Sequence, residues 1–169
     1  CREAAVVFDV SHLGTVRVEG SDGFDRLQAA LTNDLRKIGP GRAQYTHLLD
    51  DADASVLDDI IVWWIDTDRF DVMPNASNTD RVVTGLGIGL DVTEERAILA
   101  VQGPDALRIV ATLIPSLADL VRNDVRSITW DGVDIVVAGT GYTGEAGCEL
   151  AVPAAAAERV WGALLAAGV

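Results

Sequence analysis

The sequence alternates short apolar runs with tight polar turns, a pattern that predicts β-hairpins. Two hairpins are expected, one pairing residues 56–65 with 70–73 and the other pairing residues 125–130 with 133–138. The second pair flanks Asp131-Gly132, and an Asp-Gly pair favours a type I′ turn because both central residues of that turn need positive φ. Strands joined by so short a turn pair antiparallel.

The remaining apolar runs indicate further strands and a few helices. Strands are expected at residues 6–10, 14–19, 44–49, 97–102 and 150–152. Helices are expected at residues 21–31, 76–85, 105–113 and 154–167, the first of them capped by Ser21. Because hairpins prevail over strand–helix alternation, the sequence predicts an α+β fold with mostly antiparallel sheets and interspersed helices. It predicts one domain over residues 1–169, with a possible subdomain boundary near residues 85–95, and no internal repeat is visible.

Composition and charge exclude several classes of protein. The chain has 26 acidic and 13 basic residues, a net charge of −13, and this argues against nucleic acid as a partner because phosphate binding needs clustered Lys and Arg. No apolar run is long enough for a membrane helix, and the balance fits a cytoplasmic protein. The two cysteines and two histidines are not spaced as metal ligands, so no metal site is expected. No nucleophile–base motif and no phosphate loop occurs, so chemistry here would rest on carboxylates.

The glycine-rich run Gly139–Glu149 is the most informative candidate for a ligand site. Its four glycines permit left-handed or crowded backbone conformations. Glu149 leads into the apolar residues 150–152, so we expect its carboxylate to be fixed at the edge of a strand. Its two oxygens could then accept hydrogen bonds from a ring that bears adjacent N–H donors. The alternative is a glycine-rich hairpin loop with two solvated acids, Glu145 and Glu149, and such loops are common.

Asp58 and Asp59 interrupt an otherwise apolar strand. Neighbouring residues of a strand point to opposite faces, so at most one of the two faces a given cavity. A carboxylate on the buried face needs hydrogen-bond partners or a raised pKa, and this makes one of the pair a candidate proton handler or ligand contact. The alternative is that one aspartate is solvated while the other bonds a backbone amide or an arginine.

Taken together, several stretches of the chain resemble the aminomethyltransferase family, the T-protein of the glycine cleavage system. They are residues 8–14, 32–35, 40–46, 57–62, 75–78, 101–104 and 140–149. The resemblance covers the central folate-binding portion of that family, so we expect this chain to be a piece of a longer protein.

The resemblance implies a tetrahydrofolate site. By it, Asp58 is the principal catalytic carboxylate and Glu149 binds the pterin ring. The other residues that it assigns to the folate pocket are Tyr45, Tyr142, Asn75, Asp59 and Leu13, the last standing where the family often has methionine. Two departures concern the loops beside the site: Ala54-Ser55 replace a frequent Gly-Gly, and Pro74 replaces a valine, which suggests an edge or a bulge because proline cannot donate to a ladder.

The implied reaction transfers a one-carbon unit from an aminomethyl-lipoyl carrier protein to tetrahydrofolate, releasing ammonia and giving 5,10-methylenetetrahydrofolate. Two alternatives stay open. One is the folate-binding domain of a sarcosine- or dimethylglycine-dehydrogenase-type enzyme. The other is a folate-binding assembly protein without transferase activity, whose Lys-Gly-Cys-Tyr signature differs from Gly139–Tyr142. It also stays open that the isolated piece is inactive without the rest of the longer protein.

Overall fold

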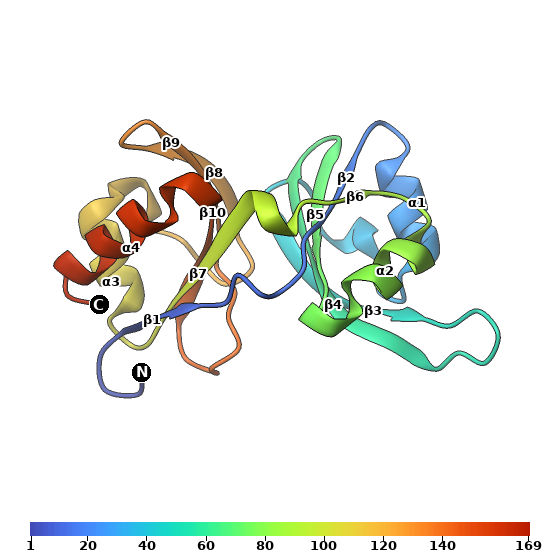
Figure 1. Cartoon of the computed structure of the whole chain (residues 1–169), viewed down its shortest axis with the longest axis horizontal. Coiled ribbons are helices and arrows are strands. Elements are labelled where there is room, and N and C mark those ends of the chain that lie inside the picture. Colours follow the sequence, from blue (N-terminus) through green and yellow to red (C-terminus); the bar gives the residue numbers. More distant parts are fainter. The chain divides into compact units, whose positions relative to one another are not determined.

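The computed structural model describes residues 1–169, which group by their internal contacts into two compact units. We name the unit His12–Thr93 the Asp58 unit, and the unit made of Cys1–Ser11 and Glu94–Val169 the Glu149 unit. The chain therefore leaves the Glu149 unit after Ser11 and re-enters it at Glu94 (Figure 1). A subdomain boundary near residues 85–95 stays a prediction, because grouping by contacts does not test whether either unit folds alone.

The Asp58 unit is a five-stranded antiparallel sheet in the order β3-β4-β5-β2-β6. Its strands are β2 (Val16–Glu19), β3 (Arg42–Leu49), β4 (Val56–Asp66), β5 (Arg69–Met73) and β6 (Leu90–Asp91). Its helices are α1 (Gly23–Ala30) and α2 (Thr79–Leu86), with short 3-10 helices η1 (Leu35–Lys37) and η2 (Ala76–Asn78). A further 3-10 helix, η3 (Thr93–Glu95), follows β6.

The Glu149 unit is also a five-stranded antiparallel sheet, in the order β1-β7-β10-β9-β8. Its strands are β1 (Val6–Asp9), β7 (Arg96–Gln102), β8 (Val125–Trp130), β9 (Val133–Ala138) and β10 (Gly147–Pro153). Its helices are α3 (Ala106–Leu113) and α4 (Ala157–Ala166), with 3-10 helices η4 (Pro115–Leu117) and η5 (Ala154–Ala156). None of the helices in the chain is long and apolar enough to cross a membrane.

Each unit has its own apolar core between one face of its sheet and its two helices. In the Asp58 unit, Ile60 and Val62 of β4 pack with Leu27 of α1. In the Glu149 unit, Leu150 of β10 packs with Leu164 of α4. Burying each such side chain stabilises the fold by about 1.5–3 kcal/mol. Because side chains alternate along a strand, the residues between these core positions lie on the opposite face of each sheet.

The two units repeat one topology. Each runs strand, helix, three-strand meander, helix: β2-α1-β3-β4-β5-α2 in one and β7-α3-β8-β9-β10-α4 in the other. The order of the sheets corresponds as well, with β2 beside β5 and β7 beside β10. Only the fifth strand differs in origin, since β6 follows α2 whereas β1 comes from the N-terminal segment. The structure thus repeats although the sequence shows no repeat.

The α+β fold with antiparallel sheets is confirmed. Asp131 and Gly132 have φ values of 48° and 74°, the positive values that a type I′ turn requires. Two local expectations are wrong. Helix α1 begins after Asp22 rather than Ser21, and the Asp22 side chain makes no capping hydrogen bond. Pro74 marks neither an edge nor a bulge, because β5 is an interior strand that ends at Met73 and Pro74 directly follows it.

Candidate active site

The carboxylate of Glu149 lies inside the central strand of its sheet, not at the edge of a strand as expected. Glu149 is the third residue of β10 and is only 8% exposed. It lies opposite Ala100 of β7 on one side and Ala138 of β9 on the other. Since Cys148 and Leu150 point into the core, Glu149 points to the face that the helices do not cover. The expectation of a solvated acid is therefore wrong for this residue.

The electrostatic surroundings of Glu149 are unusual because no cation is paired with it. The hydrogen bond to its carboxylate comes from the hydroxyl of Thr140, which donates to Oε2. Burial raises the pKa of Glu149, and the Thr140 bond opposes that rise. The result is a buried carboxylate with a single neutral partner and an Oε1 available to further donors.

Most glycines of the run Gly139–Glu149 are crowded by other atoms of the protein. A Cβ on Gly139 would lie 2.2 Å from the carbonyl oxygen of Val121, and one on Gly147 would lie 2.2 Å from that of Val101. Gly144 has a φ of 79°, which side-chain-bearing residues rarely adopt. The crowded and left-handed conformations expected from the sequence are present. They do not by themselves indicate a ligand, because the close neighbours belong to the protein.

Gln102, the last residue of β7, is hydrogen-bonded to this loop through its side chain. It is fully buried, and its Nε2 donates to the carbonyl oxygen of Thr140 at 3.2 Å. Its Oε1 accepts a hydrogen bond from the hydroxyl of Thr143 at 3.0 Å. Sequence reasoning missed Gln102 and Thr140 as site residues. The available signal was a lone amide side chain closing the apolar run of residues 97–101, followed directly by Gly103-Pro104.

Tyr142 lies between the two loop residues that Gln102 contacts. The residue is 57% exposed, and its ring centroid lies 6.0 Å from that of Phe8, with an angle of 57° between the ring planes. Burial and the charge of Glu149 both raise the pKa of Tyr142. The structure therefore brings Tyr142 and Glu149 together, and the ring of Tyr142 adds an exposed aromatic surface.

Asp58 is the buried member of the aspartate pair. It is 3% exposed and lies on the same face of β4 as Ile60, toward the core. Its Oδ2 accepts the backbone N–H of Asn75 at 2.9 Å. Its Oδ1 accepts the side-chain amides of Asn75 at 2.8 Å and Asn78 at 2.9 Å. Three neutral N–H donors, delivered by the segment between β5 and α2, thus hold this carboxylate without any cation.

Asp59 points to the opposite face and is exposed, as the strand periodicity predicts. The side chain of Asn75 reaches it too, donating to Asp59 Oδ1 at 3.1 Å and to its carbonyl oxygen at 3.0 Å. The structure therefore joins Asp58, Asp59, Asn75 and the unpredicted Asn78 into one network. It also contains the contacts of the structural alternative, a solvated aspartate beside one that bonds a backbone amide.

Two further predicted residues of the Asp58 unit lie outside this network. Tyr45 is 50% exposed on β3 and lies opposite Ile61, so it shares the face of Asp59 rather than that of Asp58. Leu13 is half-buried in the segment that precedes β2.

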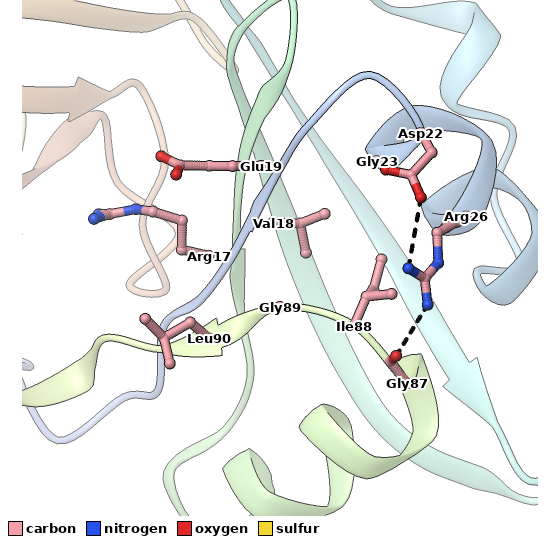
Figure 2. A pocket seen from close by; sticks show the side chains of 10 residues that line it. All are labelled: Arg17, Val18, Glu19, Asp22, Gly23, Arg26, Gly87, Ile88, Gly89 and Leu90. Carbon is pink, nitrogen blue, oxygen red and sulfur yellow. Dashed lines mark hydrogen bonds and ion pairs between the residues drawn. The ribbon is translucent and has the colours of Figure 1, made fainter.

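A pocket of the Asp58 unit contains none of the predicted site residues. It lies between β2, the start of α1 and the segment 87–90, and Figure 2 shows its ten lining residues. Arg26 is already engaged there, with Asp22 at 3.6 Å and with the carbonyl oxygen of Gly87 at 3.0 Å. Arg17 points away from Arg26 in Figure 2 and is bound to Asp71. This pocket therefore offers no free cation, and none of the candidate site residues lines it.

Comparison with known proteins identifies the family. The family described as "GCVT N-terminal domain" matches residues 1–169. The aminomethyltransferase of Chlorobium chlorochromatii (strain CaD3) is 40% identical over 178 residues, which cover 99% of this chain and 48% of that protein. The aminomethyltransferase of Parafrankia sp. (strain EAN1pec) is 42% identical over 172 residues, covering 97% and 46%.

A solved structure agrees with these relatives. The crystal structure of glycine cleavage system aminomethyltransferase T from Bartonella henselae matches with a TM-score of 0.87 and 29% identity, covering 97% of this chain and 46% of that one. The chain thus spans about half the length of the relatives that it matches. The family match covers all 169 residues and agrees with the resemblance to aminomethyltransferases. The chain therefore belongs to the family of the GCVT N-terminal domain.

Proposed function

We propose that this chain is the folate-binding part of an aminomethyltransferase of the glycine cleavage system. The proposed reaction takes the one-carbon unit of an aminomethyl-lipoyl carrier protein, releases ammonia and gives 5,10-methylenetetrahydrofolate. Membership of the family supports the proposal. The single structural observation that carries it is the buried carboxylate of Glu149, which has a neutral hydroxyl partner and no cation.

The surroundings of Glu149 fit a pterin ring. A buried carboxylate is costly unless its oxygens are hydrogen-bonded, and Thr140 supplies one bond only. A pterin carries adjacent N–H donors that can engage both oxygens of one carboxylate. The lateral neighbours Ala100 and Ala138 bring no side-chain donor that would compete. A ligand that supplies two donors would therefore recover the cost of burying this charge.

Asp58 has a different task in the proposal. A carboxylate can accept about four hydrogen bonds, and Asp58 receives three from Asn75 and Asn78. These bonds fix its orientation, and none of them neutralises its charge. A fixed negative charge stabilises the positive charge that develops as ammonia departs, without any reorganisation of the protein at that moment. Tetrahydrofolate, when bound, supplies the nucleophilic nitrogens that take the carbon.

The remaining residues serve binding in this proposal. Tyr142 and Tyr45 offer exposed aromatic faces to the ligand, and Leu13 offers apolar surface. Asn75 and Asp59 present polar groups at the exposed side of the Asp58 network.

Isothermal titration of tetrahydrofolate into the full-length protein tests the proposal. Two hydrogen bonds to a charged group are together worth about 3–6 kcal/mol, so Glu149→Gln should weaken binding by roughly a hundredfold or more. Glu145→Gln is the matched control, because Glu145 lies in the same loop but is paired with Arg2 at 2.6 Å. It should leave the Kd within about twofold. Binding by Glu149→Gln that equals the wild type would contradict the proposed site.

The donor is tested separately with the aminomethyl-lipoyl carrier protein. Release of ammonia that requires both tetrahydrofolate and this carrier supports the glycine cleavage reaction. A full-length protein that binds folate but takes carbon only from a sarcosine- or dimethylglycine-derived donor would belong to the dehydrogenase-type alternative. Folate binding without transfer from any of these donors would favour the assembly-protein alternative.

A further inference from the structure

We infer that Gln102 is a positioning residue for the Glu149 site: its buried side-chain amide clamps the loop that carries Thr140, Tyr142 and Thr143. The effect on the loop follows from contacts within the Glu149 unit. The effect on folate affinity rests on the proposed function, so the two are tested by separate measurements.

The clamp consists of two hydrogen bonds that leave one side chain in different directions. Gln102 Nε2 donates to the carbonyl oxygen of Thr140, and Gln102 Oε1 accepts from the hydroxyl of Thr143. Nε2 also lies 3.2 Å from the carbonyl oxygen of Val101. Donor and acceptor of the amide are thus both used, and they fix the loop on both sides of Tyr142. The uncharged amide can donate and accept at the same time without bringing a charge into this fully buried position.

The loop is shaped to receive this side chain. A Cβ on Gly141 would lie 2.0 Å from Gln102 Oε1, and one on Gly147 would lie 2.6 Å from Gln102 Nε2. These distances are shorter than any non-bonded contact of a real Cβ atom, so two of the four glycines leave room for the amide. The glycines and Gln102 are therefore parts of one arrangement.

The clamp connects to the carboxylate through Thr140. That residue is buried, its carbonyl oxygen is held by Gln102, and its hydroxyl donates to Glu149 Oε2. A continuous series of hydrogen bonds therefore runs from Thr143 through Gln102 and Thr140 to Glu149. If Gln102 is removed, Thr140 loses the contact that orients it toward Glu149, and Tyr142 loses support on both sides.

The test uses the full-length protein with Gln102→Met, which keeps the approximate length of the side chain and removes its hydrogen bonds to Thr140, Thr143 and Val101. Amide hydrogen exchange of residues 140–146 reports the opening of the loop, and isothermal titration reports the Kd for tetrahydrofolate. Two lost hydrogen bonds correspond to at least a tenfold effect, so exchange in the loop should accelerate about tenfold or more and the Kd should rise by a similar factor.

Gln44→Met is the matched control. Gln44 is also a buried glutamine, and its Nε2 donates to the carbonyl oxygen of Asp34 at 3.0 Å within the Asp58 unit. The control removes a comparable contact elsewhere, so it should leave exchange of residues 140–146 unchanged. Thr143→Val and Thr143→Ser complete the series. Thr143→Val should reproduce part of the Gln102→Met effect, and Thr143→Ser, which keeps the hydroxyl, should restore wild-type behaviour.

The outcomes separate this inference from the proposed function. Faster loop exchange and weaker folate binding in Gln102→Met, with rescue by Thr143→Ser relative to Thr143→Val, would support positioning. Unchanged loop exchange in Gln102→Met would overturn it. Faster exchange with an unchanged Kd would also overturn it, because the order of the loop would then have no effect on folate affinity. A wild-type protein without folate binding would refute the proposed function and, with it, positioning for folate, whatever the exchange shows.

Discussion

The two units place a buried acid on the same face of the corresponding strand, yet they surround it differently. In the Asp58 unit, Asp71 of β5 lies opposite Arg17 of β2, which donates to it at 3.0 and 3.3 Å. In the Glu149 unit, the residue opposite Glu149 on the corresponding strand is Ala100. Both acids are nearly inaccessible to solvent.

The difference shows that burial of an acid does not by itself indicate a functional site. The carboxylate of Asp71 is paired with the guanidinium of Arg17 within the protein, so its negative charge is already compensated. Glu149 has only the Thr140 hydroxyl, so its carboxylate has no ionic partner within the protein. What separates the two is the residue that the neighbouring strand places beside the acid.

The units differ also in the turn that leads into this strand. In the Asp58 unit, β4 passes to β5 through Thr67-Asp68 alone. In the Glu149 unit, the longer glycine-rich segment 139–146 separates β9 from β10. This segment supplies Thr140 and Tyr142, so the same topology gains a candidate ligand site through one extended turn.

The largest expected effect tests whether Asp58 serves catalysis while Glu149 serves folate binding, as proposed. Asp58→Asn keeps the shape of the side chain and removes its charge, so it should lower kcat by about a thousandfold, comparable with the loss of one preorganised electrostatic group. The Kd for tetrahydrofolate should change much less than in Glu149→Gln. Steady-state kinetics and titration of the full-length protein measure both quantities. Full turnover by Asp58→Asn with folate bound would refute a catalytic role for this carboxylate.

The structural acid is tested by removing its cation. Arg17→Met leaves Asp71 buried without a charged partner and should lower the free energy of unfolding by about 3 kcal/mol, somewhat reduced because Arg17 is partly exposed. Urea unfolding of the full-length protein measures this change. Arg26→Met is the control, since the exposed Arg26–Asp22 pair should contribute less than about 1 kcal/mol. Equal effects of the two variants would remove the distinction between Asp71 and Glu149.

The extended turn is tested by filling the space beside Gln102. Gly141→Ala should destabilise the Glu149 unit by about 2 kcal/mol, because its Cβ would clash with the buried amide. Gly162→Ala in α4 is the control, as its Cβ meets nothing within 4 Å and alanine favours a helix. Thermal unfolding compares the two. If Gly141→Ala proved as stable as Gly162→Ala, the close approach of the loop to Gln102 would be incorrect.

The smallest effect concerns the pH dependence of stability. The pKa of Glu149 in the folded protein lies above its ordinary value of 4.5. The folded state therefore holds this proton more tightly than the unfolded chain does. The resulting stabilisation is fully present below about pH 4.5 and is lost as the pH rises through the raised pKa. Unfolding free energies of wild type and Glu149→Gln, measured in urea from pH 4 to 8, should thus differ in favour of wild type at the acidic end. A difference that is constant with pH would contradict an uncompensated Glu149.

Sequence reasoning succeeds here where the physical cause is local. The turn at Asp131-Gly132 and the opposite faces of Asp58 and Asp59 follow from φ preferences and strand periodicity, and both are observed. It fails where the cause is a contact between distant residues. The hydrogen bond between Gln102 and Thr140 depends on the pairing of β7 with β10, and no local sequence pattern predicts that pairing.

The glycines illustrate the same limit in another way. Their number predicts unusual backbone, and the structure contains it. The sequence could not predict why glycine is needed at each position, because this depends on the neighbouring atoms. Those atoms belong to Val121 beside Gly139 and to Gln102 beside Gly141.

The separate origin of β1 has a consequence for synthesis on the ribosome. Val6 pairs with Gln102, so β1 emerges long before its partner strand is made, whereas every strand of the Asp58 unit lies within residues 12–93. All strands of the Asp58 unit are therefore synthesised between β1 and its partner β7. Compaction of residues 12–93 would shorten the effective chain between β1 and β7 and so lower the entropy cost of joining them. The nascent chain would thus complete the Glu149 sheet after every strand of the Asp58 unit has been synthesised.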